Sequence, residues 1–263
     1  MTGLVERDGV TLAYSTAGLG DPPIVFVHGW SCDQSYFAPQ IDHFARRHAT
    51  AALDLRGHGA SGVPDPGVGV YDIETFADDV LAVAAEAGFN RPVVIGHSLG
   101  GVIALECATR PDAVRAAVMV DPAPILNAPI KAFIGQAADA IEDDVDGSWR
   151  EAFVKGMFLP TDTVRRDEII RGMTTLPPAV AAAAIRSIDR FDGAAAFAAA
   201  TVPVLSIGSA FPSDSAAEFH TACKTITVGQ TVGAGHFNQL EVPEQVNVMI
   251  ERFLAVNGLS TPD

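Results

Sequence analysis

Short apolar runs bounded by turn residues recur along the chain, separated by segments with a helical period. The runs occupy residues 24–27, 50–53, 93–95, 116–120, 204–207 and 225–228. They lack the apolar-polar alternation of a strand with one solvent-exposed face. Continuous apolar runs are typical of parallel strands that are covered on both faces. The pattern predicts the inner strands of a mostly parallel sheet.

Two alternating segments, at residues 4–7 and 10–16, precede these runs. Asp8 and Gly9 join them, and this dipeptide accepts the positive φ angles of a tight hairpin turn. We expect a pair of edge strands here, which makes the predicted sheet eight-stranded.

Apolar residues at three- and four-residue spacing predict amphipathic helices between the strands. Ile73, Phe76, Val80 and Val83 form one stripe, and Asp72 stands at the position of an N-cap. After Pro243, a favourable first-turn residue, a second stripe contains Val246, Met249, Ile250, Phe253 and Leu254. This alternation indicates an α/β fold whose sheet is flanked by helices.

One long stretch breaks the rhythm after the sixth predicted strand. It contains helical patterns but no convincing strand, at residues 131–141, 149–157, 165–173 and 179–187. We expect residues 124–200 to form a helical lid over a core domain made of residues 1–123 and 201–263. Its aromatic and Met residues are candidates for a substrate pocket, although such a stripe is also typical of core packing: Trp149, Phe153, Met157 and Phe158.

Composition narrows the classes of partner. The chain of 263 residues has 17 basic and 32 acidic side chains, a net charge of −15, and 48% apolar residues. A chain of this length and composition builds a large core, which excludes disorder. Negative charge without a basic run argues against nucleic acid and anionic membranes. A small-molecule substrate is the expected partner.

Cofactor and compartment signals point the same way. Cys32, Cys107 and Cys223 lie far apart, which suits neither disulfides nor a zinc cage and is typical of thiols in a reducing compartment. No signal-peptide or membrane-length apolar run stands out, and no dinucleotide or phosphate-loop fingerprint is present. We therefore expect a cytoplasmic protein without cofactor or metal.

The sharpest chemical motif is Gly96-His97-Ser98-Leu99-Gly100, a G-x-S-x-G sequence between a predicted strand and a helix. In that context the strand-to-helix turn holds the serine hydroxyl clear of the sheet, at the N-terminus of the helix. Ser98 is the candidate nucleophile.

A serine hydroxyl needs a base within hydrogen-bond reach to become nucleophilic near neutral pH. His236 lies in the glycine-rich segment 233–237, after the last predicted strand and before the last helix. The order Ser98 and then His236 matches the chain order of α/β-hydrolases.

With these motifs the sequence resembles the α/β-hydrolase superfamily over nearly its whole length. The strand at 24–27 runs into His28-Gly29-Trp30, the turn at 54–59 reads Asp-Leu-Arg-Gly-His-Gly, and Gly-His-Phe at 235–237 precedes Val-Pro-Glu at 242–244. The resemblance implies an α/β-hydrolase fold with an oxyanion hole formed by the N–H groups of Leu99 and Trp30. It also puts Trp30 at the wall of the acyl pocket. For His28 it favours a residue that fixes the loop through hydrogen bonds over one that contacts substrate.

The third member of the catalytic triad departs from the common family pattern. The family usually carries the acid three residues after a glycine that ends the seventh strand, and Phe211 occupies that position here, with Asp214 three residues later. A minority takes the acid from the end of the sixth strand, where Asp121 stands 121 − 98 = 23 residues after Ser98. We favour Asp121, with Asp214 as the alternative acid; Asp121 is otherwise a turn cap before Pro122.

The residues favour a serine hydrolase that cleaves a small carboxylic ester or lactone through an acyl-enzyme on Ser98. A serine in the elbow excludes haloalkane dehalogenases and epoxide hydrolases, which need a carboxylate there. A carbon-carbon bond hydrolase, a cofactor-independent ring-opening dioxygenase and a non-catalytic receptor stay open. The dioxygenase is less favoured because Ser31 and Cys32, not histidine, follow Trp30.

Overall fold

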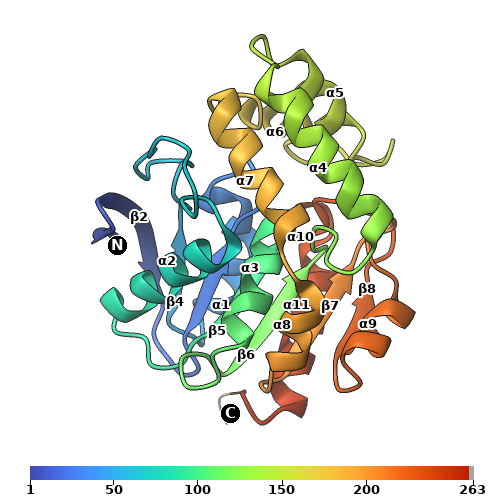
Figure 1. Cartoon of the computed structure of the whole chain (residues 1–263). Coiled ribbons are helices and arrows are strands. Elements are labelled where there is room, and N and C mark those ends of the chain that lie inside the picture. Colours follow the sequence, from blue (N-terminus) through green and yellow to red (C-terminus); the bar gives the residue numbers. More distant parts are fainter. Residues whose placement is uncertain (261–263) are drawn as a thin grey trace.

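The computed structural model describes residues 1–260 and has an eight-stranded sheet at its centre (Figure 1). The strands are β1 (Thr2–Arg7), β2 (Val10–Ala17), β3 (Ile24–Val27), β4 (Thr50–Leu53), β5 (Val93–His97), β6 (Ala116–Val120), β7 (Val204–Gly208) and β8 (Thr227–Gln230). Their order across the sheet is β1-β2-β4-β3-β5-β6-β7-β8. The hairpin strand β2 is antiparallel to both β1 and β4, and all other pairs are parallel. The predicted fold class is confirmed.

The last strand begins two residues later than the apolar run at 225–228 predicts. Thr227 pairs with Leu205 and Gln230 with Gly208, whereas the Ile226 N–H donates to the Cys223 carbonyl oxygen in a turn. The apolar signal of Ile226 is real, because its side chain is buried, but its backbone belongs to the turn.

Helices cover both faces of the sheet. One face carries α2 (Ile73–Glu86), α3 (Leu99–Ala108) and α8 (Gly193–Ala199), and the other carries α1 (Ala38–Phe44) and α11 (Pro243–Val256) (Figure 1). Shorter helices complete the core: η1 (Gln34–Phe37), α9 (Ala216–Ala222) and α10 (Asn238–Glu241).

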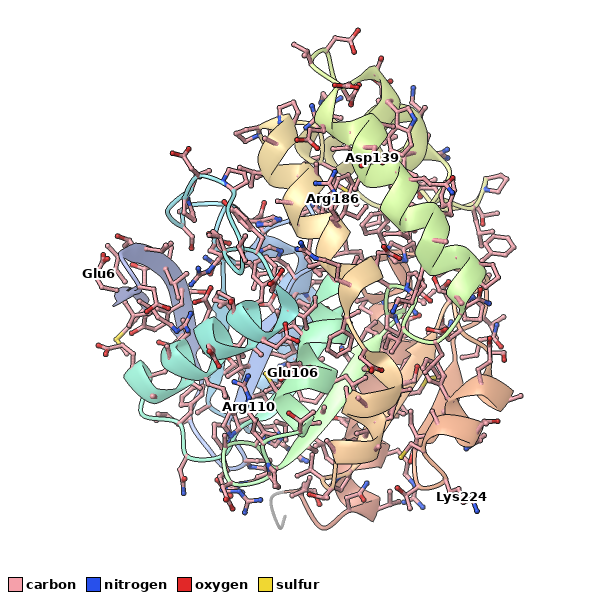
Figure 2. All side chains as sticks on the ribbon, in the orientation of Figure 1. Glu6, Glu106, Arg110, Asp139, Arg186 and Lys224 are labelled. Carbon is pink, nitrogen blue, oxygen red and sulfur yellow. The ribbon has the colours of Figure 1, made fainter. Side chains whose placement is uncertain are left out.

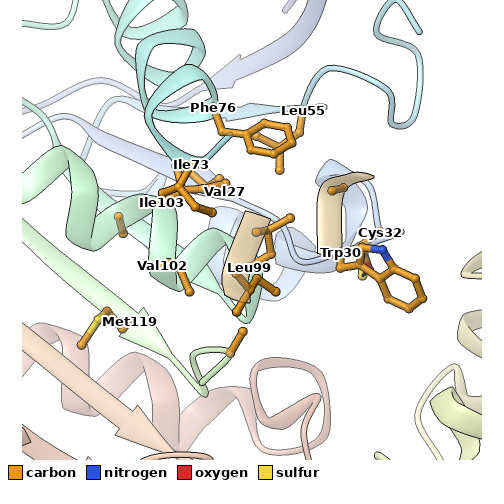
Figure 3. Packing of buried hydrophobic residues seen from close by; sticks show 14 of the residues in the cluster. Val27, Trp30, Cys32, Leu55, Ile73, Phe76, Leu99, Val102, Ile103 and Met119 are labelled. Carbon is orange, nitrogen blue, oxygen red and sulfur yellow. Dashed lines mark hydrogen bonds between the residues drawn. The ribbon is translucent and has the colours of Figure 1, made fainter. Parts of the chain in front are cut away.

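Residues of the inner strands point alternately to the two faces. In β3, Val25 and Val27 pack with the apolar stripe of α2, while Ile24 and Phe26 pack with α11. Figure 3 shows Val27 among side chains of α2 and α3 on the first of these faces. Because both faces are buried, the strands read as continuous apolar runs in the sequence.

The segment between β6 and β7 is helical in the described structure. Before α8 it contains α4 (Ala128–Glu142), α5 (Ser148–Lys155), α6 (Arg166–Gly172) and α7 (Pro178–Arg190), which lie together beyond one end of the sheet (Figure 1). The helix α8 instead packs against α3 on the sheet face. We use "lid segment" below for residues 124–190, because α8 is part of the core layer.

Ion pairs and hydrogen bonds fasten the lid segment internally and to the core. Arg186 of α7 pairs with Asp139 of α4 at 2.9 Å (Figure 2). Arg190 pairs at 2.6 Å with Asp72, which stands at the N-cap of α2 but makes no capping hydrogen bond with its side chain. The carboxylate expected to cap a helix thus holds the lid segment instead.

None of the helices within residues 1–260 is long and apolar enough to cross a membrane.

Candidate active site

The elbow at Ser98 has the backbone geometry that its two glycines predict. Ser98 has φ 55° and ψ −117°, a strained conformation for a residue with a side chain. A Cβ atom at Gly96 would lie 1.8 Å from the Gly100 carbonyl oxygen, and one at Gly100 would lie 2.1 Å from the Val27 carbonyl oxygen. The Ser98 N–H donates to the Val120 carbonyl oxygen over 3.0 Å, which ties the elbow to β6.

The candidate oxyanion donors flank this elbow. Leu99 is the first residue of α3, where backbone N–H groups have no partner within the helix. Opposite it, a Cβ atom at Gly29 would lie 3.1 Å from Cβ of Ser98, so the loop after β3 touches the elbow. Trp30 follows in this loop, and its indole N–H donates to the Ala181 carbonyl oxygen of α7 over 2.8 Å.

His236 and Asp121 meet at the carboxyl ends of the strands. Nδ1 of His236 lies 2.7 Å from Oδ2 of Asp121, and the other carboxylate oxygen accepts the Ser209 N–H over 2.8 Å. The Asp121 N–H donates to the Ile207 carbonyl oxygen of β7, which fixes the backbone of this residue at φ 38°. Because the Nδ1–H faces the carboxylate, Nε2 is left to accept a proton.

Asp214 lies at a different place and has a different set of partners. Its carboxylate accepts the backbone N–H groups of Ile125, Leu126 and Asn127 at 2.6–2.9 Å. Burial raises the pKa of Asp214, against the opposing effect of these three hydrogen bonds. Asp121 thus contacts the imidazole of His236, whereas Asp214 binds the backbone at the start of the lid segment.

Ser98, His236, Asp121 and Trp30 line one cavity of about 440 Å³ beneath the lid segment. Its other walls are mostly apolar: Ala123, Pro124, Ile130, Phe133, Ile134, Ala152, Phe153, Gly156, Met157, Ile185, Ile188, Ser209, Phe211 and Ser213. Among these described lining residues no Lys or Arg is present, and the one acid, Asp121, is paired with His236. The cavity is therefore mostly apolar, and the polar side chains of its described lining are Ser98, Ser209, Ser213, Asp121, His236 and the Trp30 indole.

Two of the five predicted pocket residues, Phe153 and Met157, line this cavity, and three lie outside the lining that the described residues form. Trp149 stacks behind Phe153 at 5.2 Å between ring centroids, and Phe158 stacks on Phe237 at 5.0 Å. Phe153 lies in α5 and Phe158 lies in the turn after it. The sequence alone does not show which of these side chains faces the cavity.

His28 is fully buried and serves the loops around the site. Its Nδ1–H donates to the Gly29 carbonyl oxygen over 2.8 Å, and its Nε2 accepts the Leu55 N–H over 3.0 Å. Burial lowers the pKa of His28, so the ring is neutral. Of the two roles considered for His28, its contacts are those of a residue that fixes the loop.

Sequence reasoning missed two groups that hold the site together. The Ser209 N–H orients Asp121, and Nε2–H of His97 donates to the His236 carbonyl oxygen over 2.8 Å. A backbone N–H leaves no trace in residue type, and the position of His97 within the G-x-S-x-G motif does not reveal the partner of its ring. The position of Ser209 directly after a strand-ending glycine was the one available signal.

The thiol of Cys32, two residues after Trp30, is held in its neutral form. It is buried, its Sγ donates to the Trp30 carbonyl oxygen over 3.3 Å, and burial strongly raises its pKa. A thiol is a poor nucleophile in this state.

A model of the alpha/beta hydrolase family matches residues 24–248 of the chain. This stretch contains the elbow, both candidate oxyanion positions, Asp121 and His236. The chain belongs to this family.

Similar proteins include enzymes with several activities. A 2-(acetamidomethylene)succinate hydrolase of Mesorhizobium japonicum is 29% identical over 172 residues, 61% of this chain and 58% of that protein. A bifunctional esterase/perhydrolase of Acinetobacter calcoaceticus is 36% identical over 127 residues, 47% of this chain and 45% of that protein. The matched regions thus span about half the length of these curated relatives. A solved structure described as an N-acyl homoserine lactone degrading enzyme superposes with a TM-score of 0.78 at 25% identity, covering 95% of this chain and all of that one.

Proposed function

We propose that this protein is a serine hydrolase that cleaves small, uncharged carboxylic esters or lactones through an acyl-enzyme on Ser98. One observation carries the proposal: the strained Ser98 elbow and the His236–Asp121 pair line the same apolar cavity. Backbone strain of this kind is found mostly at active sites and ligand-binding sites.

In the proposed first step Nε2 of His236 takes the Ser98 hydroxyl proton while Oγ attacks the carbonyl carbon of the substrate. Asp121 keeps the imidazole in the tautomer with hydrogen on Nδ1 and stabilises the imidazolium that forms. The N–H groups of Leu99 and Trp30 are the proposed donors to the oxyanion, and loss of one such donor typically costs about 3 kcal/mol.

The tetrahedral intermediate then collapses as the carbon-oxygen bond of the leaving group breaks. His236 returns its proton to the leaving oxygen, which departs as an alcohol or, in a lactone, stays tethered to the acyl group. In the second half a water molecule attacks the acyl carbon of the Ser98 ester while His236 takes one of its protons. The bond from the acyl carbon to Oγ then breaks, His236 returns the proton to Oγ, and the carboxylic acid is released. Water is the second substrate, and the proposed reaction needs no other reactant.

The walls of the cavity support an uncharged acyl group. A carboxylate on the substrate would leave water for a chamber whose described lining has no cation, which is unfavourable. The net charge of −15 adds long-range repulsion of anions. A lactone or ester substrate agrees with the names of the lactone degrading enzyme and the esterase/perhydrolase among the similar proteins.

The test is a panel of p-nitrophenyl esters of graded acyl length beside aliphatic and aromatic lactones, with wild-type protein and Ser98→Ala. We expect wild-type turnover, its loss in Ser98→Ala, and labelling of Ser98 by an organophosphonate detected by mass spectrometry. Unlabelled Ser98 together with tight binding of an intact ligand would support a receptor. Oxygen uptake with a hydroxyquinolone would support the ring-opening dioxygenase instead.

A further inference from the structure

Four hydrogen bonds hold the backbone of residues 234–236. One runs from the Ala210 N–H to the Ala234 carbonyl oxygen over 3.0 Å, one involves His97, and two join this backbone to residues 157–162 of the lid segment. The His236 N–H donates to the Met157 carbonyl oxygen over 3.0 Å, and the Gly235 N–H donates to Oδ2 of Asp162 over 3.0 Å. From the other side, Nε2–H of His97 donates to the His236 carbonyl oxygen over 2.8 Å. The peptide that carries the imidazole is therefore held between the lid segment and the elbow.

Asp162 is buried, and its carboxylate accepts a hydrogen bond from outside its own turn. Its side chain is 1% exposed, and Oδ2 also accepts the Leu159 N–H over 2.7 Å, which fixes the carboxylate on its own segment. The other oxygen, Oδ1, has no hydrogen-bond partner among the described residues. The contact with Gly235 is what the local turn does not explain.

Gly235 fits this contact as only a residue without a side chain can. A Cβ atom there would lie 2.5 Å from Oδ2 of Asp162 and 2.7 Å from the Met157 carbonyl oxygen. Its φ lies outside the left-handed region, so the small residue serves the close approach and not the turn. The lid segment and the loop of His236 thus pack backbone to backbone.

We propose that Asp162 is a positioning residue for His236, acting through the Gly235 N–H. The inference rests on the proposed function, in which His236 is the catalytic base. It makes residues 157–162 part of the apparatus that aims the imidazole, in addition to the wall that Met157 contributes to the cavity.

Removing the carboxylate frees the Gly235 N–H and loosens the loop. Misplacement of a reacting group by about 1 Å can lower a rate by about 100-fold. For Asp162→Ala we expect kcat for p-nitrophenyl butyrate to fall by about ten- to 100-fold. We expect KM to change by less than about threefold, because Asp162 lies outside the described cavity lining. Asp162→Asn keeps an oxygen for both N–H groups and should restore kcat to within about threefold of wild type.

A second readout does not depend on activity. The Nδ1–H of His236, hydrogen-bonded to Asp121, is expected to give a low-field proton resonance in NMR spectra, assigned by its loss in His236→Gln. This resonance should weaken or vanish in Asp162→Ala and persist in Asp162→Asn. It reports the aim of the imidazole even if the esters tested are not hydrolysed.

Matched controls separate positioning from general loosening of the lid segment. Asp144→Ala removes another buried carboxylate of this segment. It accepts the backbone N–H groups of Trp149 and Arg150, pairs with the Arg150 guanidinium at 2.9 Å, and makes no hydrogen bond to the loop of His236 within the described residues. It should lower stability but keep the resonance. Gly235→Ala should reproduce the loss seen in Asp162→Ala, whereas Gly172→Ala, whose Cβ would meet nothing closer than 3.7 Å, should not.

The outcomes are distinct. A folded Asp162→Ala protein with the resonance and kcat of wild type overturns the inference, as does an equal loss in Asp144→Ala. If Asp162→Ala does not fold, Gly235→Ala and Asp162→Asn decide the question by the same readouts. Failure of the proposed function is seen separately, as equal ester turnover by wild type and Ser98→Ala.

Discussion

Nδ1 of His236 lies 2.7 Å from Oδ2 of Asp121, although 115 residues separate them along the chain. The acid stands at the end of β6, and the loop after β7, which carries the acid in most of the family, supplies the Ser209 N–H that orients Asp121. Asp214 in the same loop is free to hold the lid segment. The loop after β7 therefore orients Asp121 through the Ser209 N–H and holds the start of the lid segment through Asp214.

Exchange of each acid for its amide should separate these two roles. Asp121→Asn places an N–H donor or a misoriented oxygen opposite the imidazole, so the wrong tautomer is favoured and kcat should fall by up to about 10⁴-fold. Asp214→Asn should keep kcat within a few-fold. Steady-state kinetics with one p-nitrophenyl ester compares them, and a large loss confined to Asp214→Asn would contradict our assignment.

Asp214 should matter for stability. In Asp214→Ala, the buried N–H of Ile125 and the part-buried N–H groups of Leu126 and Asn127 lose their acceptor. Leaving a buried donor unsatisfied costs about 1–3 kcal/mol, and a part-buried one costs less because water reaches it. We expect the free energy of unfolding in urea to fall by about 3 kcal/mol. Asp192→Ala is the control, since Asp192 caps α8 through the Ala195 N–H alone, and it should cost about 1 kcal/mol. Equal losses would refute the role of Asp214 as an anchor.

Buried histidines should make the protein sensitive to mild acid. Burial lowers the pKa of His58 to about 3, and it holds the pKa of His97 well below its ordinary value. As pH falls below 6.5 the unfolded chain protonates these rings while the folded protein keeps them neutral, so stability declines.

Each such group is expected to contribute a loss of about 1.4 kcal/mol between pH 7.5 and 5.5. Urea unfolding at both pH values measures it. His58→Asn should reduce the pH dependence, and replacement of the exposed His220 by Gln should leave it unchanged. A free energy of unfolding that does not change over this range would be inconsistent with neutral, buried rings.

The charge of the acyl group should decide between substrates of equal length. We expect p-nitrophenyl pentanoate to be hydrolysed with a kcat/KM at least about ten times that of mono-p-nitrophenyl glutarate, since the glutarate carboxylate must be desolvated in an apolar chamber. Ile130→Arg adds a cation to the lining and should narrow the ratio, while Ile130→Met should not. Equal rates for the two esters in wild type would show that the acyl group lies elsewhere.

The sequence by itself determined the sheet, the elbow and the chain order of the candidate pair, because each depends on local constraints. Buried parallel strands are continuously apolar. Gly96 and Gly100 predict the strained turn at Ser98 from a motif of five residues. His236 followed from its place after the last strand.

Only the tertiary structure decided which acid meets His236, where His28 and Phe158 lie, and that Asp162 reaches Gly235 across 73 residues. Such contacts depend on how loops pack over the ends of strands. A carboxylate has the same chemistry in either loop, and its partner is set by the distance and direction that folding imposes.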